Sequence, residues 1–223
     1  MESPGAIGRE AEATGVKRPP LRRTQSERSA STRGRLIDAA IECLCDLGYA
    51  GATTGAIVER AGLSRGALLH HFRTRDALMR EVGVEISRRL EALFFEMVAE
   101  LPSEASFKDV FIIGRRQIQT REFRANAVLQ TATRADPTAG PFFAELQSRY
   151  EAQSKVRLTE RAVRAGIKPG RRLDAFLDLV AVVGGGFLIQ MGLPDGRRKI
   201  DAAVQQLSDI AEVLFPSGDT GKA

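Results

Sequence analysis

Hydroxyl, guanidinium and imidazole side chains are concentrated in one short stretch of the sequence, between Thr53 and Leu78. These groups donate hydrogen bonds to phosphate oxygens, and arginine can also donate two hydrogen bonds to one guanine. Elsewhere the sequence offers no glycine-rich phosphate loop, no spacing of metal ligands and no acid–base pair with a credible partner. We therefore expect a DNA-binding protein and no enzyme, with neither a metal nor a cofactor.

Two short helices joined by a tight turn are predicted to hold these side chains. Thr53 and Thr54 can cap the first helix, and Gly62 permits the positive φ that ends it. Ser64 is the next N-cap, so a second helix is expected from about Arg65 to His71. Two helices with such a glycine-containing turn are the signature of a helix-turn-helix, which places the start of its second helix in the major groove of DNA.

The start of the second helix supplies the candidates for base recognition. Its inward face is expected to carry Leu68 and Phe72, which leaves the opposite face to meet DNA. His71 is expected to be structural, and the adjacent His70 and His71 do not form a metal site because neighbouring helical side chains diverge. The residues expected to face base edges are Ser64, Arg65, Gly66 and Leu69.

Length and composition favour an all-α protein with a basic N-terminal arm. The chain has 223 residues, 43% of them hydrophobic, and a formal net charge of +5, which favours a polyanionic partner. Residues 1–30 combine Gly, Pro, Ser, Thr and Arg with few large apolar side chains, so they are expected to be disordered. This arm is either a phosphate or minor-groove contact or a solvated tail. It lacks the apolar core of a secretory signal, which favours a cytoplasmic protein.

Apolar residues with helical spacing predict further helices on both sides of the helix-turn-helix. A first helix is expected from Ser31 or Thr32 to Leu47, where Gly48 ends it. Thr74 can cap a long helix that ends before Pro102. The remaining helices are expected at roughly Phe107 to Thr120, Phe123 to Arg134, Pro141 to Ala165, Arg171 to Met191 and Gly196 to Phe215.

These helices predict two folded domains between two flexible ends. The expected order is a disordered arm at 1–30, a DNA-binding head at 31–78, a helical ligand-binding and dimerisation domain at 79–216 and a flexible tail at 217–223. The apolar stretch Leu179 to Gly192 is short of a membrane span because aspartates flank it, so no membrane is expected.

Three consecutive glycines, Gly184 to Gly186, interrupt that apolar stretch. Each weakens a helix by about 1 kcal/mol relative to alanine, so the close approach of another helix is expected to compensate. The last helix carries a second apolar stripe, and symmetric pairing of the last two helices would bury both. We therefore expect a homodimer, with packing within one chain as the alternative.

Residues Thr32 to Val82 resemble the DNA-binding head of the tetracycline-repressor (TetR) family of bacterial regulators. The resemblance rests on the Gly48-Tyr49 pair, the paired threonines that open the second helix, the sequence AGLS at 61–64 and the closing His-Phe at 71–72. It implies an all-α fold in which a three-helix head joins a helical second domain. Beyond the head the resemblance is one of architecture only.

The resemblance also implies roles for individual residues. Thr54, His70 and Arg75 match positions that contact backbone phosphates, and Thr53 stands beside Thr54 at the same helix start. Leu69 stands where the family often has tyrosine, which replaces a polar contact by an apolar one, for example to a thymine methyl group. Such proteins bind a pseudopalindromic operator on double-stranded DNA as dimers, repress by occluding a promoter and respond to a small-molecule effector. The helix from Thr74 to about Leu101 would then act as the lever between the domains.

The effector site is the least determined part of the sequence. Pockets combine apolar walls with a few polar groups, but each candidate fits the core or the surface equally well. A DNA-binding dimer without a ligand therefore stays open, and so does an activator, because that depends on operator position. The candidate ligand-binding residues are Phe111, Gln130, Arg134, Phe143, Phe187 and Gln190.

Overall fold

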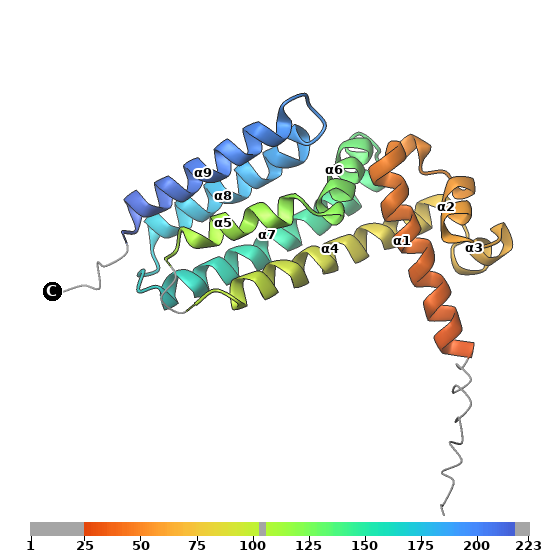
Figure 1. Ribbon diagram of the computed structural model, residues 1–223, viewed down its shortest axis with the longest axis horizontal. Coiled ribbons are helices and arrows are strands. Elements are labelled where there is room, and N and C mark those ends of the chain that lie inside the picture. Colours follow the sequence, from red (N-terminus) through yellow and green to blue (C-terminus); the bar gives the residue numbers. More distant parts are fainter. Residues whose placement is uncertain (1–24, 103–105, 217–223) are drawn as a thin grey trace, which may run out of the picture.

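The computed structural model describes residues 25–102 and 106–216. Throughout these residues the regular secondary structure is helical, which confirms the all-α fold class (Figure 1). In the order of the chain, the helices of the described residues are α1 (Gln25–Gly51), α2 (Thr54–Ala61), α3 (Arg65–His71), α4 (Arg75–Ala99), α5 (Asp109–Ile118), α6 (Arg121–Thr133), α7 (Ala139–Arg164), α8 (Arg171–Gln190) and α9 (Gly196–Leu214).

Helix α1 begins at Gln25, before the expected start at Ser31 or Thr32. Residues 25–30 are therefore helical, and the expectation of disorder was wrong for them. Extending an existing helix adds one hydrogen bond per ordered residue without a new nucleus, so polar residues can continue it into solvent. Gly48 breaks the helix as expected, with a φ of 71°. The rest of the expected arm, residues 1–24, and the expected tail at 217–223 lie outside the described residues.

The two helices of the helix-turn-helix are capped as the sequence predicts. Thr53 Oγ1 accepts a hydrogen bond from the Ala56 amide at 3.2 Å, and Ser64 Oγ accepts one from the Ala67 amide at 3.1 Å. Gly62 ends α2 in the left-handed region with a φ of 60°. These local bonds satisfy amides that a helix start leaves unpaired, so the turn is held by its own sequence.

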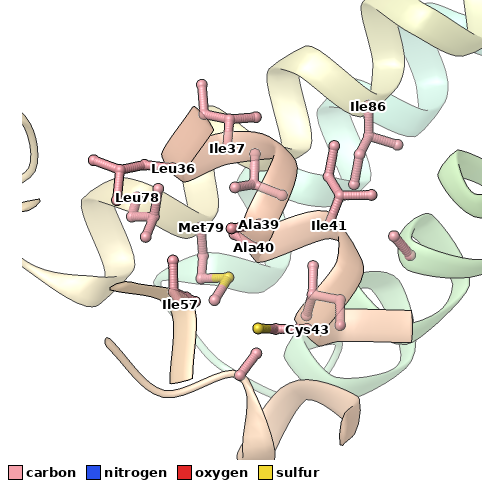
Figure 2. Packing of buried hydrophobic residues seen from close by; sticks show 14 of the residues in the cluster. Leu36, Ile37, Ala39, Ala40, Ile41, Cys43, Ile57, Leu78, Met79 and Ile86 are labelled. Atoms are coloured by element: carbon pink, nitrogen blue, oxygen red, sulfur yellow. The ribbon is translucent and has the colours of Figure 1, made fainter. Parts of the chain in front are cut away.

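The core of the head lies between α1, α2, α3 and the start of α4. Figure 2 shows Leu36 of α1 beside Leu78 of α4, Ile41 of α1 near Ile86 of α4, and Ile57 of α2 near Met79 of α4. The same cluster continues along α4 and takes in Phe143 of α7, together with buried residues of α6. The expected boundary at Leu78 is thus the place where α4 leaves the head, while packing continues across it.

The second domain is a bundle of α4 to α9 whose helix ends agree closely with the predicted ones. In Figure 1, α8 and α9 run side by side on one side of the bundle, and α4 runs along the opposite side from the head. A second apolar cluster fills the bundle, and edge-to-face contacts join Phe107, Phe111 and Phe176 within it. Phe123 of α6 packs against both clusters, so apolar packing is continuous from α9 to the head.

Helix α8 is more exposed than the sequence predicts. With 20 residues and a mean hydropathy of 1.7, it is long and apolar enough to cross a membrane, contrary to the expectation that the segment is too short. Within the single chain, 28% of its most apolar window is buried. One side of α8 packs on α6, α7 and α9, and the other side leaves Val182 at 74% exposure.

Candidate nucleic-acid interface and ligand cavity

The start of α3 presents a continuous exposed surface. Leu68 is fully buried and anchors the helix, whereas its neighbour Leu69 is 51% exposed. A large apolar side chain so exposed on a short helix is typical of a contact surface. The other predicted base-facing residues and His70 are also exposed, so α3 brings together on one face Ser64, Arg65, Gly66, Leu69 and His70.

The start of α2 provides a second group of exposed polar atoms. Thr53 is exposed and Thr54 is half-buried. The Thr53 hydroxyl accepts the capping bond through its oxygen, which leaves its hydrogen free to donate to a phosphate. Both helix starts also carry unpaired amides and the positive end of a helix dipole, which favour phosphate groups.

Arg75, predicted to contact a phosphate, has several partners within the head. Its Nε donates to the carbonyl of Ala52 at 3.0 Å, and its Nη2 donates to the carbonyl of Tyr49. The guanidinium also lies 4.3 Å from the centre of the Tyr49 ring. These contacts hold the end of α1 and the start of α2 against α4, so we propose that Arg75 braces the head and does not bind DNA directly.

Ion pairs join the head to the second domain. Arg89 of α4 contacts three carboxylates: Asp38 of α1 at 2.5 Å, Glu85 of α4 at 2.8 Å and Glu122 of α6 at 3.7 Å. The Cys45 thiol of α1 also donates to the carbonyl of Arg121, which begins α6, at 3.3 Å. Helix α1 is thereby tied to the N-terminal end of α6 as well as to α4.

Glu85 gives this junction a pH dependence. Hydrogen bonds from Arg88, and then from Arg89, lower the pKa of Glu85 from its usual 4.5 to about 2. A lowered carboxyl pKa stabilises the folded state above the unfolded value, and this contribution is lost as the pH falls from about 4.5 to 2. We expect Glu85→Gln to lower the free energy of unfolding by about 1 kcal/mol at pH 7.

The measurement is urea unfolding at a series of pH values. The difference between Glu85→Gln and the unsubstituted protein should shrink below pH 4.5 and vanish near pH 2. Glu145→Gln is the matched control, because the Glu145 ion pair with Arg149 is exposed and remote from the junction. A difference for Glu85→Gln that stays constant with pH would contradict this assignment.

A cavity of about 150 Å³ lies inside the second domain, between α4 to α9. Of the predicted ligand-binding residues, Phe111 and Phe187 line it. Its other apolar walls come chiefly from α4, α6, α7, α8 and α9. The residues that define these walls are Leu90, Phe94, Phe123, Leu158, Leu177 and Val204.

The other four predicted ligand-binding residues lie outside this cavity. Phe143 is buried against Gly83 in the core that continues from the head, and Gln130 donates to the Phe143 carbonyl at 3.0 Å. Arg134 is exposed at the end of α6, and Gln190 lies at the end of α8. An aromatic or polar residue type alone does not show which side of a helix faces a cavity, so these four predictions are not supported.

Polar cavity residues on α7 were missed by the sequence analysis. Gln147, Glu151 and Ser154 recur at helical spacing and share the face of α7 that carries Leu158. This spacing could have identified them, because polar residues on the same helix face as buried apolar residues indicate a polar site inside the protein. Gly114, Gly184 and Gly185 also line the cavity, and an added Cβ at each would meet no atom within 4 Å.

Comparison with known proteins places these features in a family. The sequence profile of the bacterial regulatory proteins of the tetR family matches residues 36–82. An HTH-type transcriptional regulator of Mycobacterium tuberculosis is 39% identical over 84 residues, which cover 38% of this chain and 43% of that protein. The repressor AcnR of Corynebacterium glutamicum is 22% identical over 192 residues, which cover 84% of this chain and 93% of AcnR.

Solved structures show the same fold across both domains. A transcriptional regulator from Rhodococcus sp. Rha1 superposes with a TM-score of 0.62 at 19% identity, covering 81% of this chain and 96% of that one. The regulator FadR of Bacillus subtilis, solved with stearoyl-CoA, gives a TM-score of 0.58 at 15% identity, covering 78% of this chain and 97% of FadR.

The capped helix-turn-helix and the helical second domain define a two-domain fold that bacterial regulators share. Residues 36–82 are a DNA-binding domain of the TetR family. The matched segment spans less than half the length of the Mycobacterium relatives, at 43% of each. The part of this chain that resembles these relatives is therefore the segment that contains the DNA-binding head.

Proposed function

We propose that the protein is a transcriptional regulator, acting as a repressor, that binds a pseudopalindromic operator as a homodimer in the bacterial cytoplasm and releases it when a small molecule binds. The observation that carries the proposal is the exposed face of α3, with Arg65 and Leu69 side by side on a helix that Ser64 caps. The name of AcnR as a repressor supports the same direction of control. An activator would use the same surface at another operator position.

Each exposed group of the head has a chemical role in this proposal. The Arg65 guanidinium can donate two hydrogen bonds to guanine, and Leu69 can contact a thymine methyl group. Gly66 lets the backbone approach the bases closely because it has no side chain. The hydroxyls of Thr53, Thr54 and Ser64 and the His70 imidazole donate to phosphates, which sets the register of α3 on the duplex.

The proposed dimer uses the exposed side of α8 and α9. An added Cβ at Gly186, which does not line the cavity, would meet no atom within 4 Å, so no close helix within the chain compensates for this glycine. If α8 and α9 of a second chain packed on α8 and α9 of the first about a two-fold axis, the exposed apolar residues of both chains would be buried in a four-helix bundle. Large apolar residues exposed on these helices and the turn between them are Leu179, Val182, Ile189, Leu193, Ile210 and Val213.

Helix α6 offers a route from the cavity to the head. Its residues Phe123 and Asn126 line the cavity, and its first turn carries Arg121 and Glu122, which contact α1 and Arg89. A ligand that displaces α6 would therefore move α1 and change the separation of two heads in a dimer. A coupling of about 1–3 kcal/mol between cavity and head changes operator affinity roughly 5–150-fold.

Selection of binding sites from a random DNA pool by the purified protein tests the proposed function. The expected product is an inverted repeat, because two identical heads meet two half-sites about one helical turn apart. No enrichment, with binding that disappears uniformly as salt rises, would contradict sequence-specific regulation and leave only nonspecific electrostatic binding.

The same selection with Arg65→Ala tests base recognition by α3. We expect the inverted repeat to persist while the preference at one base pair of each half-site is lost, which corresponds to about 1–3 kcal/mol of discrimination. Arg73→Ala is the matched control, because Arg73 is exposed just beyond α3 and is expected to affect all sequences alike. An unchanged half-site with Arg65→Ala would show that Arg65 does not contact a base.

A further inference from the structure

The walls of the cavity in the second domain differ sharply in chemistry. Most of the lining is aliphatic or aromatic, and four phenylalanines, Phe94, Phe111, Phe123 and Phe187, contribute to it. The polar lining comes mainly from α7, with contributions from α5 and α6. A ligand is thus offered an apolar volume with one polar side.

The polar side contains hydrogen bonds whose directions are fixed. Gln117 is 6% exposed, and its Nε2 donates to the carbonyl of Leu90 at 2.8 Å. Its Oε1 must therefore face Tyr150, whose hydroxyl donates to it at 2.9 Å. With its hydrogen committed, the Tyr150 oxygen can only accept, and the Ser154 side chain already makes one hydrogen bond to it, which leaves one lone pair for a ligand.

A second series of bonds ends at Glu151. Asn126 Nδ2 donates to Gln147 Oε1 at 3.5 Å, and Gln147 Nε2 donates to Glu151 Oε1 at 2.9 Å. The other oxygen of the Glu151 carboxylate remains an acceptor. Both series therefore leave acceptors toward the ligand, one phenolic and one anionic.

The net charge beside the cavity is negative. Lys155 also lines the cavity, but its Nζ pairs with Asp178 of α8. Within the described residues Glu151 has no such ion pair, and its only hydrogen-bond partner is the neutral Gln147. Burial raises the pKa of Tyr150, the hydrogen bonds of Gln117 and Ser154 oppose this shift, and the charges of Glu91 and Glu151 add to it.

We propose that the effector is a small hydrophobic amine, bound with its ammonium group at Glu151 and its apolar body among the phenylalanines. This inference rests on the proposed function, in which the cavity holds the effector. A protonated amine supplies donors for the free oxygen of Glu151 and for the remaining lone pair of the Tyr150 oxygen, and aromatic faces attract a neighbouring cation. A carboxylate of the same size would face like charge in a desolvated site.

The size of the cavity limits the apolar body to about one ring. Its volume is about 150 Å³, and an apolar cavity of about this size in another protein binds benzene. The open positions at Gly114, Gly184 and Gly185 extend the apolar end, so side chains added there would occupy the ligand volume.

The test is calorimetric titration of the full-length protein with benzylamine, benzyl alcohol, toluene and benzoate. These probes share one ring and differ in the polar group. We expect benzylamine to bind roughly tenfold or more tighter than benzoate at pH 7, because hydrogen bonds to charged groups are the strong ones. Glu151→Gln should remove this advantage and leave the binding of toluene unchanged.

Two further variants locate the effect. Glu145→Gln changes the same charge on an exposed part of α7 and should preserve the preference for benzylamine. Gly114→Leu should block all four probes by filling the cavity; probe binding that survives this substitution would overturn the inference.

Benzoate that binds as tightly as benzylamine would overturn the inference about charge and leave the proposed effector cavity in place. Binding of none of the probes would overturn the inference about ligand class. In both cases an inverted repeat from the random DNA pool would show that the proposed regulator function stands, and its absence would show that the proposed function has failed.

Discussion

Val182→Glu is expected to convert the protein from a dimer to a monomer and to weaken operator binding by roughly a hundredfold or more, because linked half-sites gain about that much over single ones. Val182 is 74% exposed on α8, in the middle of the apolar stripe proposed as the dimer interface. A two-fold axis places the new carboxylate on both copies, so two like charges enter an apolar interface without partners. Sedimentation velocity gives the oligomeric state, and a DNA titration gives the affinity.

Val156→Glu is the matched control for this substitution. Val156 is 57% exposed on α7, outside the α8 and α9 stripe, so the same change there should leave the dimer intact. A dimer that persists in Val182→Glu would place the interface elsewhere. Because α8 is long and apolar, a membrane is the alternative to a second copy as the partner of its exposed side. Flotation of the unsubstituted protein with lipid vesicles would favour the membrane.

Gly83→Val is expected to lower the free energy of unfolding by roughly 1–3 kcal/mol, the usual cost of overpacking a core. A Cβ at Gly83 would lie 3.0 Å from Cδ1 of Phe143, closer still to its Cε1, and 3.5 Å from Leu146 Cδ1. Phe143 is 3% exposed, so its ring has little room to move away. Urea unfolding measures the change, and DNA titration shows whether the close packing of α4 on α7 also matters for binding.

Gly34→Val provides the comparison. Gly34 lies in α1, and a Cβ there would meet no atom within 4 Å, so we expect a change within about 0.5 kcal/mol. If Gly83→Val were as stable as Gly34→Val, the Phe143 ring would have to move at little cost. In that case the contact of α4 with α7 would be too loose to transmit a change from the cavity to the head.

The helix-turn-helix was predictable because its determinants are local. Thr53 and Ser64 cap their helices through amides three residues later, and Gly62 ends α2 through its own φ. The outward direction of Leu69 follows from helical spacing once Leu68 faces the core. Such relations span a few residues, so a short sequence window contains all of the physics that sets them.

The ligand cavity was predictable only in part because its walls come from six different helices. Phe111 and Phe187 were found through their residue type, but Phe143 has the same type and packs against Gly83 instead. Glu151 was missed because its role depends on Gln147 at its side and on α5 and α8 across the cavity. Which face of a helix a neighbour covers is decided by packing between segments far apart in the chain.

Local sequence patterns were enough to predict the all-α class, the ends of most helices apart from the start of α1, and the residues of α3 that face outward. Only the tertiary structure decided that Arg75 braces Tyr49 and Ala52, that Arg89 joins α1 to α6, and that α8 leaves an apolar side exposed. Helix propensity, capping and hydrophobic periodicity act within a few residues, so the sequence displays them directly. The partner of a guanidinium and the residues that cover a helix face depend on the whole chain.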